Sequence, residues 1–356
     1  MPWMFWLFLL LLLIPAAGFA YQWLGALADR RLMEDGEMVE SGGGRLYLLK
    51  RGIGEPTVVF ESGFAATSLN WLLIQDALCR ESATVVYDRG GLGWSDGASS
   101  ERTPTNIAGE LRAALIAVGI EPPYLLVGHS FGGLVIRRFA LEYPGDVCGM
   151  VLVDPMRTWE WPPLNAPRRA TVDRAIQLTR MAVWIARFGA ARLAVISLLC
   201  RSGKLAKKLA ELAGGQGLYL FDRLTSEVGK MPPMVRPGIA AHWSAPAFYQ
   251  GLLAHLNGLA ATVLEMHDAQ PISGIPVLIL TPGSARPLTV EEQRAIADDT
   301  RQIIAEKSQH WVHLDEPELV IESIREMRRS VIVGECLPNN NYASGFRNAE
   351  SAVSAD

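Results

Sequence analysis

The chain has 356 residues, 49% of them hydrophobic and 20% charged, so it is long enough to bury a large core. Its formal net charge of −4 and the lack of any basic cluster argue against a nucleic-acid partner, which would require a clustered basic face. The cysteines are widely separated and form no C-x-x-C pair, so neither a disulfide framework nor a metal site is expected; they are Cys79, Cys148, Cys200 and Cys336. No cofactor motif is present in the sequence.

Residues 1–30 are expected to form a single-pass membrane anchor. The run 3–28 contains no charged residue and exceeds the roughly 20 residues that a helix needs to cross a bilayer. Its Trp and Tyr residues lie toward its two ends, as is typical of membrane interfaces. The alternative is a signal peptide cleaved after Gly18-x-Ala20, but no Lys or Arg precedes the run. Two arginines follow it, which favours the cytoplasmic side for the body of the chain.

From residue 44 onward, two kinds of apolar segment alternate along the chain. Runs rich in β-branched and aromatic residues predict strands, and apolar residues at helical spacing predict helices. The alternation indicates an α/β fold with a mostly parallel sheet flanked by helices, built from residues 44–155 and 271–335. The expected strands lie within 44–52, 57–63, 83–96, 123–130, 149–155, 275–283 and 300–307, and the expected helices at 68–79, 103–119, 131–144, 288–299 and 317–332.

Residues 156–270 break the alternation and are expected to form a helical cap over the sheet. The run 181–200 is apolar except for Arg187 and Arg192. A second membrane span there would bury both arginines, at about 2.5–3.5 kcal/mol each, so cap helices are the better interpretation. The segment 338–356 is polar and lacks periodicity, which predicts a disordered tail.

The stretch YLLVGHSFGG, residues 124–133, predicts a nucleophile at Ser130. Its G-x-S-x-G pattern follows a predicted strand and precedes a predicted helix, which is the context of a nucleophile elbow. The glycines on either side allow the tight turn, and the backbone N–H of Phe131 is expected to face the reacting carbon. The alternative is a turn serine whose glycines serve packing alone.

A serine nucleophile requires a general base, because its hydroxyl is inert at neutral pH. His310 and His313 lie between the last predicted strand and the last predicted helix, at the carboxyl edge of the sheet where ligands bind. His129 is inside the elbow and is expected to point away from the Ser130 hydroxyl. The other histidines fall in the predicted cap: His242, His255 and His267.

Residues 44–335 resemble the α/β-hydrolase fold superfamily, in its capped esterase, lipase and dehalogenase-like branch. The resemblance rests on VVFESGFAATSLNW, VVYDRGGLGWSDG, VGHSFGGLVIRRFALEYP with VLVDP, and SQHWVHLDEPELV. It implies that His310 is the catalytic histidine, followed by the aromatic Trp311, and that His313 holds a non-catalytic position. Gln309 stands where the family prefers glycine.

The resemblance also implies a carboxylate that orients the histidine, usually in the loop after the strand at 275–283. No Asp or Glu occurs between residues 281 and 290. Asp154 ends the strand next to the elbow strand, a position that some branches use, and we expect it to be the acid. Its alternative role is to cap the turn before Pro155. The other candidates are Glu291 and Glu292 on the following helix, and Asp298 and Asp299 at the opposite end of the last strand.

Acyl transfer needs two donors for the developing oxyanion. Phe131 N–H is one. The resemblance implies that the second is Phe64 N–H, in a loop where Ser62 replaces the usual histidine. Asp88 matches a family residue that shapes the neighbouring loop, so its expected role is structural.

These residues predict a serine hydrolase that cleaves a carboxylic ester or thioester through an acyl-enzyme on Ser130. Dehalogenases and epoxide hydrolases of this architecture use an aspartate at the elbow, so the serine disfavours both. The apolar cap and the anchor favour a hydrophobic, lipid-like acyl substrate. The alternatives are a non-catalytic ligand-binding protein on the same fold and an acyltransferase.

Overall fold

The computed structural model describes residues 2–33, 36–157, 166–199, 208 and 229–334. The predicted tail at 338–356 lies outside these residues. An eight-stranded sheet forms the centre of the molecule, in the strand order β1-β2-β4-β3-β5-β6-β7-β8. The strands are β1 (Glu37–Glu40), β2 (Arg45–Arg51), β3 (Thr57–Glu61), β4 (Thr84–Tyr87), β5 (Tyr124–His129), β6 (Val147–Val153), β7 (Val277–Pro282) and β8 (Thr300–Ala305).

The sheet is parallel from β4 to β8, while β1 pairs antiparallel with β2 and β2 pairs antiparallel with β4. The predicted α/β fold with a mostly parallel sheet is therefore confirmed. The sequence analysis did not predict β1, which is four residues long, has a single buried residue and lies at the sheet edge.

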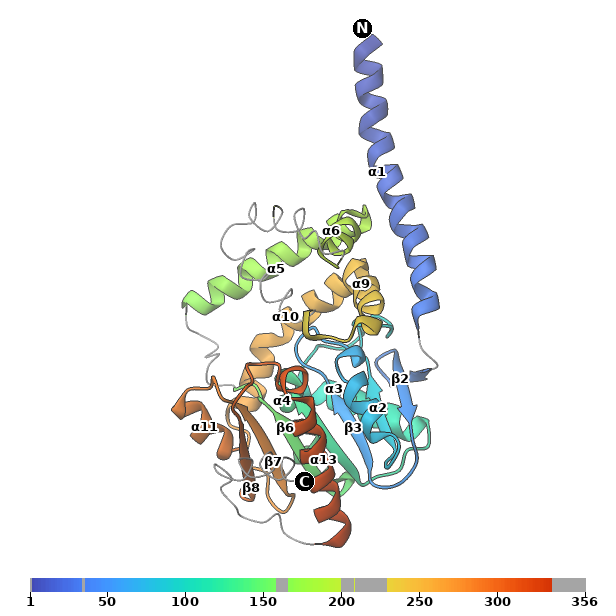
Figure 1. Ribbon diagram of the computed structural model, residues 1–356. Coiled ribbons are helices and arrows are strands. Elements are labelled where there is room, and N and C mark those ends of the chain that lie inside the picture. The colour runs from blue at the N-terminus through green and yellow to red at the C-terminus, as the bar shows by residue number, and fades with distance from the viewer. Residues whose placement is uncertain (1, 34–35, 158–165, 200–207, 209–228, 335–356) are drawn as a thin grey trace, which may run out of the picture.

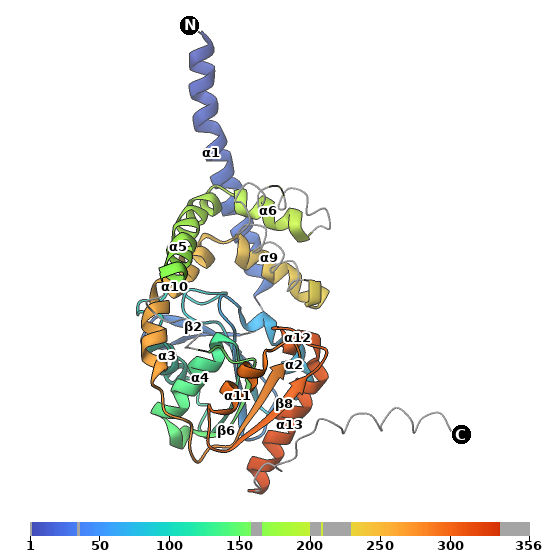
Figure 2. The same ribbon diagram turned by 90° about the vertical axis from the view of Figure 1, so that its left-hand side faces the viewer.

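Helices cover both faces of the sheet. Figure 2 shows α3 and α4 on one side, with α2 and α13 on the other. Alternate residues of β5 serve the two cores, since Leu126 packs with the α3 and α4 side chains and Leu125 with those of α2 and α13. The flanking helices are α2 (Leu72–Leu78), α3 (Pro104–Ala117), α4 (Phe131–Glu142), α11 (Pro287–Arg294), α12 (Val312–Asp315) and α13 (Pro317–Val333).

The strand order reverses between β3 and β5. β3 has β4 on one side and β5 on the other, so the chain crosses over β3 between β4 and β5. In open α/β sheets such a reversal leaves a crevice outside the carboxyl ends of the two strands. The segments that leave β3 and β5 contain Phe64 and Ser130, so the topology brings the predicted oxyanion loop and the predicted elbow to the same crevice.

Further helices lie beyond this edge of the sheet (Figure 1). They are α5 (Ala166–Arg187), α6 (Ala190–Leu199), α9 (Arg236–Ser244) and α10 (Pro246–His267), with short 3-10 helices elsewhere at Arg30–Leu32, Ser68–Asn70, Pro144–Asp146 and Pro233–Val235. The run 181–200 is not one continuous helix, because α5 and α6 are bent by 95° around Gly189, whose φ is +75°.

The first helix, α1 (Pro2–Asp29), projects away from the rest of the molecule (Figure 1). Among the residues that the structure describes, no single helix is both long and apolar enough to cross a membrane. The predicted single-pass anchor is therefore not supported by this structure. Within the described part of the chain, one bent pair of helices, α5 with α6, is long and apolar enough when the two are taken together.

The cap helix α10 is fixed to the loop that follows β4 by very close backbone contact. Gly251 lies so near Gly91 that a Cβ on it would be 1.9 Å from the Gly91 carbonyl oxygen. Farther along α10, Glu265 accepts a hydrogen bond of 2.8 Å from the backbone N–H of Thr105. The placement of α10 over the sheet thus depends on how firmly residues 91–105 are held.

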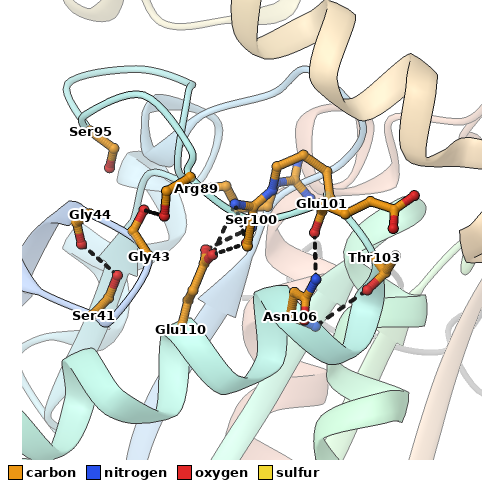
Figure 3. Close-up of polar contacts among 12 residues, drawn as sticks. Ser41, Gly43, Gly44, Arg89, Ser95, Ser100, Glu101, Thr103, Asn106 and Glu110 are labelled. Atoms are coloured by element: carbon orange, nitrogen blue, oxygen red, sulfur yellow. Dashed lines mark hydrogen bonds and ion pairs between the residues drawn. The ribbon is translucent and has the colours of Figure 1, made fainter.

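Polar contacts with α3 hold the last part of that loop (Figure 3). Glu110 of α3 accepts a 2.6 Å hydrogen bond from Ser100 and forms a buried ion pair of 2.7 Å with Arg102. Asn106 donates to the Glu101 carbonyl at 2.9 Å. The sheet-covering helix α3 therefore positions the loop on which the cap helix rests.

We predict opposite effects for two helical Gly→Ala substitutions. Gly251→Ala forces a methyl group into the Gly91 backbone and should lower the free energy of unfolding by about 1–3 kcal/mol, as overpacking does. In α3, the methyl group of Gly109→Ala would meet only the Tyr143 hydroxyl, at 3.9 Å. This substitution should raise the free energy of unfolding by up to about 1 kcal/mol, because alanine favours the helix. Urea unfolding measures the free energy of unfolding of both variants, and a change of the same sign in the two would contradict the packing argument.

Candidate active site

Ser130 is held in a strained turn between β5 and α4. Its φ of +52° and ψ of −116° lie in a region that non-glycine residues rarely adopt, at a cost on the order of 1–3 kcal/mol. Three backbone hydrogen bonds maintain the turn: Ser130 N–H donates to Val153 O at 3.0 Å, and Ser130 O accepts from Gly133 at 2.9 Å and Met156 at 3.0 Å. The strain is the geometry that a nucleophile elbow requires.

The two glycines of the G-x-S-x-G pattern are required by close contacts. A Cβ at Gly128 would lie 2.8 Å from Gly132 O, and one at Gly132 would lie 2.5 Å from Glu61 O and 2.6 Å from Ser62 O. Any larger residue at either position would separate the elbow from the start of α4 or from the end of β3.

His310 and Asp154, two of the predicted site residues, are in contact. The His310 Nδ1 lies 2.7 Å from Asp154 Oδ2. A carboxylate only accepts hydrogen bonds, so this contact places the imidazole proton on Nδ1 and leaves Nε2 as the basic nitrogen. His129 Nε2 lies 2.9 Å from the His310 carbonyl oxygen, which ties the His310 backbone to the residue next to Ser130.

Asp154 has a second partner that the sequence analysis did not identify. Gln293 of α11, fully buried, donates from Nε2 to Asp154 Oδ1 at 3.1 Å. The orientation of its amide is set by Thr281, whose hydroxyl donates to Gln293 Oε1 at 2.5 Å, and Gln302 donates in turn to Thr281 Oγ1 at 2.8 Å. Both carboxylate oxygens of Asp154 are thus hydrogen-bonded, which fixes the carboxylate against His310.

The other acid candidates are placed elsewhere. Glu292 forms an ion pair of 3.2 Å with Arg157. Asp298 and Asp299 directly precede β8, and the Asp299 carbonyl accepts a hydrogen bond from the N–H of Val277, the first residue of β7. Both residues therefore lie at the amino ends of these strands. Among the hydrogen bonds of the described residues, none joins Glu291, Glu292, Asp298 or Asp299 to His310, whose carboxylate partner is Asp154.

His313 lies in α12 and is buried. Its ring stacks on Trp71 at 4.6 Å and lies 4.4 Å from the His129 ring. Burial, with the nearby His310 and Lys230, lowers the pKa of His313 to about 3. The ring therefore stays neutral around neutral pH and serves packing, while His310 is the histidine that meets a carboxylate.

The two predicted oxyanion residues lie beside each other. The rings of Phe64 and Phe131 pack edge to face with centroids 5.5 Å apart. The cap contributes His255 of α10, whose ring lies 6.0 Å from Phe64 and 6.1 Å from Phe131. Burial lowers the pKa of His255 well below its usual value, so this neighbour is neutral.

Arg89, a second residue that the sequence analysis did not identify, holds the loop that contains Phe64. Its guanidinium donates to the Ser62 carbonyl at 3.0 Å and also to the Gly63 carbonyl, and it forms a 3.2 Å ion pair with Glu61. Glu61 also accepts a hydrogen bond from Tyr87. Burial raises the pKa of Glu61, and the Arg89 charge opposes that rise.

Asp88 has the structural role that was expected of it. Its two carboxylate oxygens accept from the backbone N–H of Ser68 at 2.7 Å and of Trp94 at 2.9 Å. Gly93 is required beside it, because a Cβ there would lie 2.0 Å from Asp88 Oδ2 and its φ is +55°.

A small cavity of about 10 Å³, close to the space that one water molecule needs, adjoins the loop after Phe64. It lies between that loop and α9, and one wall is apolar. Its lining includes Ala65, Asn70, Met231, Ile239, His242 and Trp243.

Comparison with known proteins gives matches to hydrolases. The family model described as "alpha/beta hydrolase fold" matches residues 56–181. YqjL of Bacillus subtilis (strain 168), itself uncharacterised, is 35% identical over 106 residues, 30% of this chain and 42% of that protein. RutD of Cronobacter turicensis, named as a candidate carbamate hydrolase, is 35% identical over 124 residues, 34% of this chain and 46% of that protein. The chain therefore spans less than half the length of these curated relatives.

Among solved structures, a thermophilic esterase from Thermogutta terrifontis matches with a TM-score of 0.60 at 20% identity. The match covers 83% of this chain and 99% of the esterase chain. At this identity the likeness is one of fold.

Replacing Arg89 should destabilise the protein strongly. Arg89→Leu leaves Glu61 buried without its counter-charge, which typically costs about 3–5 kcal/mol. The same change at Arg45, which forms an exposed pair with Asp96, should cost about 0–1 kcal/mol. Urea unfolding measures both, and Glu61→Gln in the Arg89→Leu background should restore part of the loss.

The Arg89→Leu deficit should also depend on pH. Without Arg89 the folded pKa of Glu61 rises further above its unfolded value, so stability is greatest at low pH and falls as pH rises through the folded pKa. The deficit should thus be larger near neutral pH than at mildly acidic pH. A deficit that does not change with pH would show that Glu61 is not the group left uncompensated.

Gln293 should affect the reactivity of Ser130. Gln293→Leu removes a hydrogen bond to a charged carboxylate, worth about 1.5 kcal/mol or more, and should slow labelling by a fluorophosphonate roughly tenfold. Gln270→Leu, at an exposed position, is the matched control and should label at the wild-type rate. Equal labelling rates in wild type and Gln293→Leu, with the protein folded, would contradict a positioning role.

Proposed function

We propose that the chain, which matches the α/β-hydrolase fold family over residues 56–181, is a serine hydrolase that cleaves a carboxylic ester or thioester. The observation that carries this proposal is the 2.7 Å contact between His310 and Asp154 at the sheet edge where Ser130 occupies a strained elbow. A serine on this turn, next to a histidine loop oriented by a carboxylate, is the arrangement that acyl transfer requires.

In the proposed mechanism the Ser130 hydroxyl oxygen attacks the substrate carbonyl carbon while His310 Nε2 accepts the hydroxyl proton. Asp154 holds the Nδ1–H and stabilises the imidazolium. The backbone N–H groups of Phe131 and Phe64 stabilise the tetrahedral oxyanion. His310 then protonates the departing alcohol or thiol, and a water molecule, deprotonated by the same nitrogen, releases the acid from Ser130.

We propose an apolar acyl group for the substrate. Met231, Ile239 and Trp243 line one side of the small cavity beside Ala65. These apolar side chains would contact a hydrocarbon chain once they moved apart to admit it. An acyltransferase would use the same residues and differ only in the acceptor, and a non-catalytic binding protein would need neither the strained serine nor the histidine–carboxylate contact.

We also propose that α1 associates with a membrane. Its aromatic residues near the N-terminus are exposed, among them Trp3, Phe5, Trp6 and Phe8. Exposed apolar residues in this number are covered by lipid or protein in stable molecules. The sequence pattern favours lipid and, through the two arginines that follow the helix, a cytoplasmic location for the catalytic part.

The decisive test is covalent labelling with a fluorophosphonate, followed by turnover of p-nitrophenyl esters of increasing chain length. Labelling should vanish in Ser130→Ala and nearly vanish in His310→Ala, because the serine is unreactive without its base. His267→Ala, at an exposed position on α10, is the matched histidine control and should label as wild type.

Turnover should rise with acyl chain length if the apolar cavity receives the acyl group. A folded wild type that neither labels nor turns over any ester would overturn the hydrolase proposal and favour the binding protein. Labelling with transfer to added alcohol in preference to water would identify an acyltransferase.

A further inference from the structure

The α5 helix has an apolar stripe on its exposed face. Its side chains recur at i, i+3, i+4 and i+7, the spacing of one helix face. The opposite face, with Val183 and Ala186, is buried toward α10. α6 continues the exposed apolar surface past the bend. The six residues, called the corner face below, are Met181 (60% exposed), Trp184 (59%), Ile185 (47%), Phe188 (44%), Leu193 (52%) and Ile196 (42%).

The shape of the corner face suits contact along a surface, because the axes of α5 and α6 are bent by 95° relative to each other. In addition, α6 contains Arg192, whose buried side chain forms a 2.6 Å ion pair with Asp29 of α1 and donates to Gln22 at 3.1 Å. Straightening the pair across a bilayer would break this buried ion pair, at a cost of several kcal/mol. The apolar residues therefore face outward from a fixed corner.

Close contacts attach α1 to the same corner. A Cβ at Gly18 would lie 2.4 Å from Phe188 O, and one at Gly25 would lie 2.5 Å from Arg192 Nε. Gly18, Gln22, Gly25 and Asp29 share one helix face, so α1 is fixed to the cap over its second half. Its first half extends beyond the cap, while the bend between α5 and α6 lies beside its second half (Figures 1 and 2).

The charge of α5 suits an anionic surface. Arg174 and Arg180 are exposed, and Arg187 lies over the Trp184 ring at 4.6 Å. Asp173 is the one acidic residue in α5. A helix with arginines beside an exposed Trp, Phe and Ile stripe has the composition of helices that lie in the membrane–water interface.

We propose that the corner face docks on a lipid bilayer with anionic head groups, with α5 and α6 in the plane of the interface and the first half of α1 directed into the bilayer. This inference rests on the membrane part of the proposed function and is independent of the hydrolase part. It places the cap against the lipid, so that an apolar ester enters the enzyme from the membrane side.

The test is photocrosslinking of the full-length chain, reconstituted into vesicles of phosphatidylcholine and phosphatidylglycerol. p-Benzoylphenylalanine replaces Trp184 in the corner face, Phe5 in α1, or Ile53 in the turn before β3. Ile53 is 87% exposed and lies at the amino edge of the sheet, away from the cap, so it is the matched exposed control. Mass spectrometry identifies lipid and peptide adducts.

Lipid adducts at positions 184 and 5, and none at 53, are expected. Adducts at position 5 without any at 184 would overturn the corner-face proposal and leave the α1 proposal standing. Peptide adducts at position 184 would show that protein covers the corner face. No lipid adduct at position 184 or position 5 would overturn both the corner-face proposal and the α1 proposal.

Vesicles of phosphatidylcholine alone should lower the yield of lipid adducts at position 184 several-fold, and an equal yield would overturn the preference for anionic lipid. Fluorophosphonate labelling of the same samples reports separately on Ser130.

Discussion

The candidate site depends on the close approach of two backbone segments, the elbow after β5 and the end of β3. At Gly132 the distance to the carbonyl groups of Glu61 and Ser62 leaves no room for a side chain. That approach brings the loop after β3 against the first turn of α4, so the amide groups of Phe64 and Phe131 come from the two segments that meet there. Arg89 donates to one of these two carbonyl groups, that of Ser62, and also to the Gly63 carbonyl. The strain at Ser130 is tolerated because both segments are fixed by these contacts.

The position of the acid has a physical consequence for the rest of the sheet. Asp154 follows β6, and the loop after β7, where the resemblance would usually place the acid, supplies none. β7 and the helix after it are nevertheless used, because Thr281 of β7 orients Gln293 of α11, and Gln293 binds the Asp154 oxygen that His310 does not contact. An amide cannot replace the carboxylate charge, but it can fix the carboxylate in the plane that His310 needs. Ser130 follows β5, Asp154 follows β6, Thr281 lies in β7 and His310 follows β8, so the site is assembled from four neighbouring strands.

Much of the core could be predicted from the sequence because local patterns determine it. Buried parallel strands are continuous apolar runs, so β3 to β8 were expected near their observed positions, and the elbow pattern identified Ser130. β1 was missed because it has one buried residue and no alternation. Arg89 and Gln293 were missed because their roles arise from distant partners: Arg89 acts on residues 62 and 63, and Gln293 on residue 154. No spacing rule in one sequence connects such residues. The expected anchor lacks support in the structure, although residues 2–29 do form one helix.

Arg192 shows how one residue can be understood differently from sequence and from structure. In the sequence it interrupts an apolar run and argues against a membrane span. In the structure its charge is buried and paired with Asp29, and such a pair contributes little net stability compared with apolar packing. Its value lies in specificity, because only one rotation of α1 places Asp29 and Gln22 against Arg192 and the two glycines against the corner. The pair thus fixes the direction in which α1 leaves the cap. Because α1 and the cap are held in one orientation, the same pair also fixes which face of the cap meets the surface that receives α1.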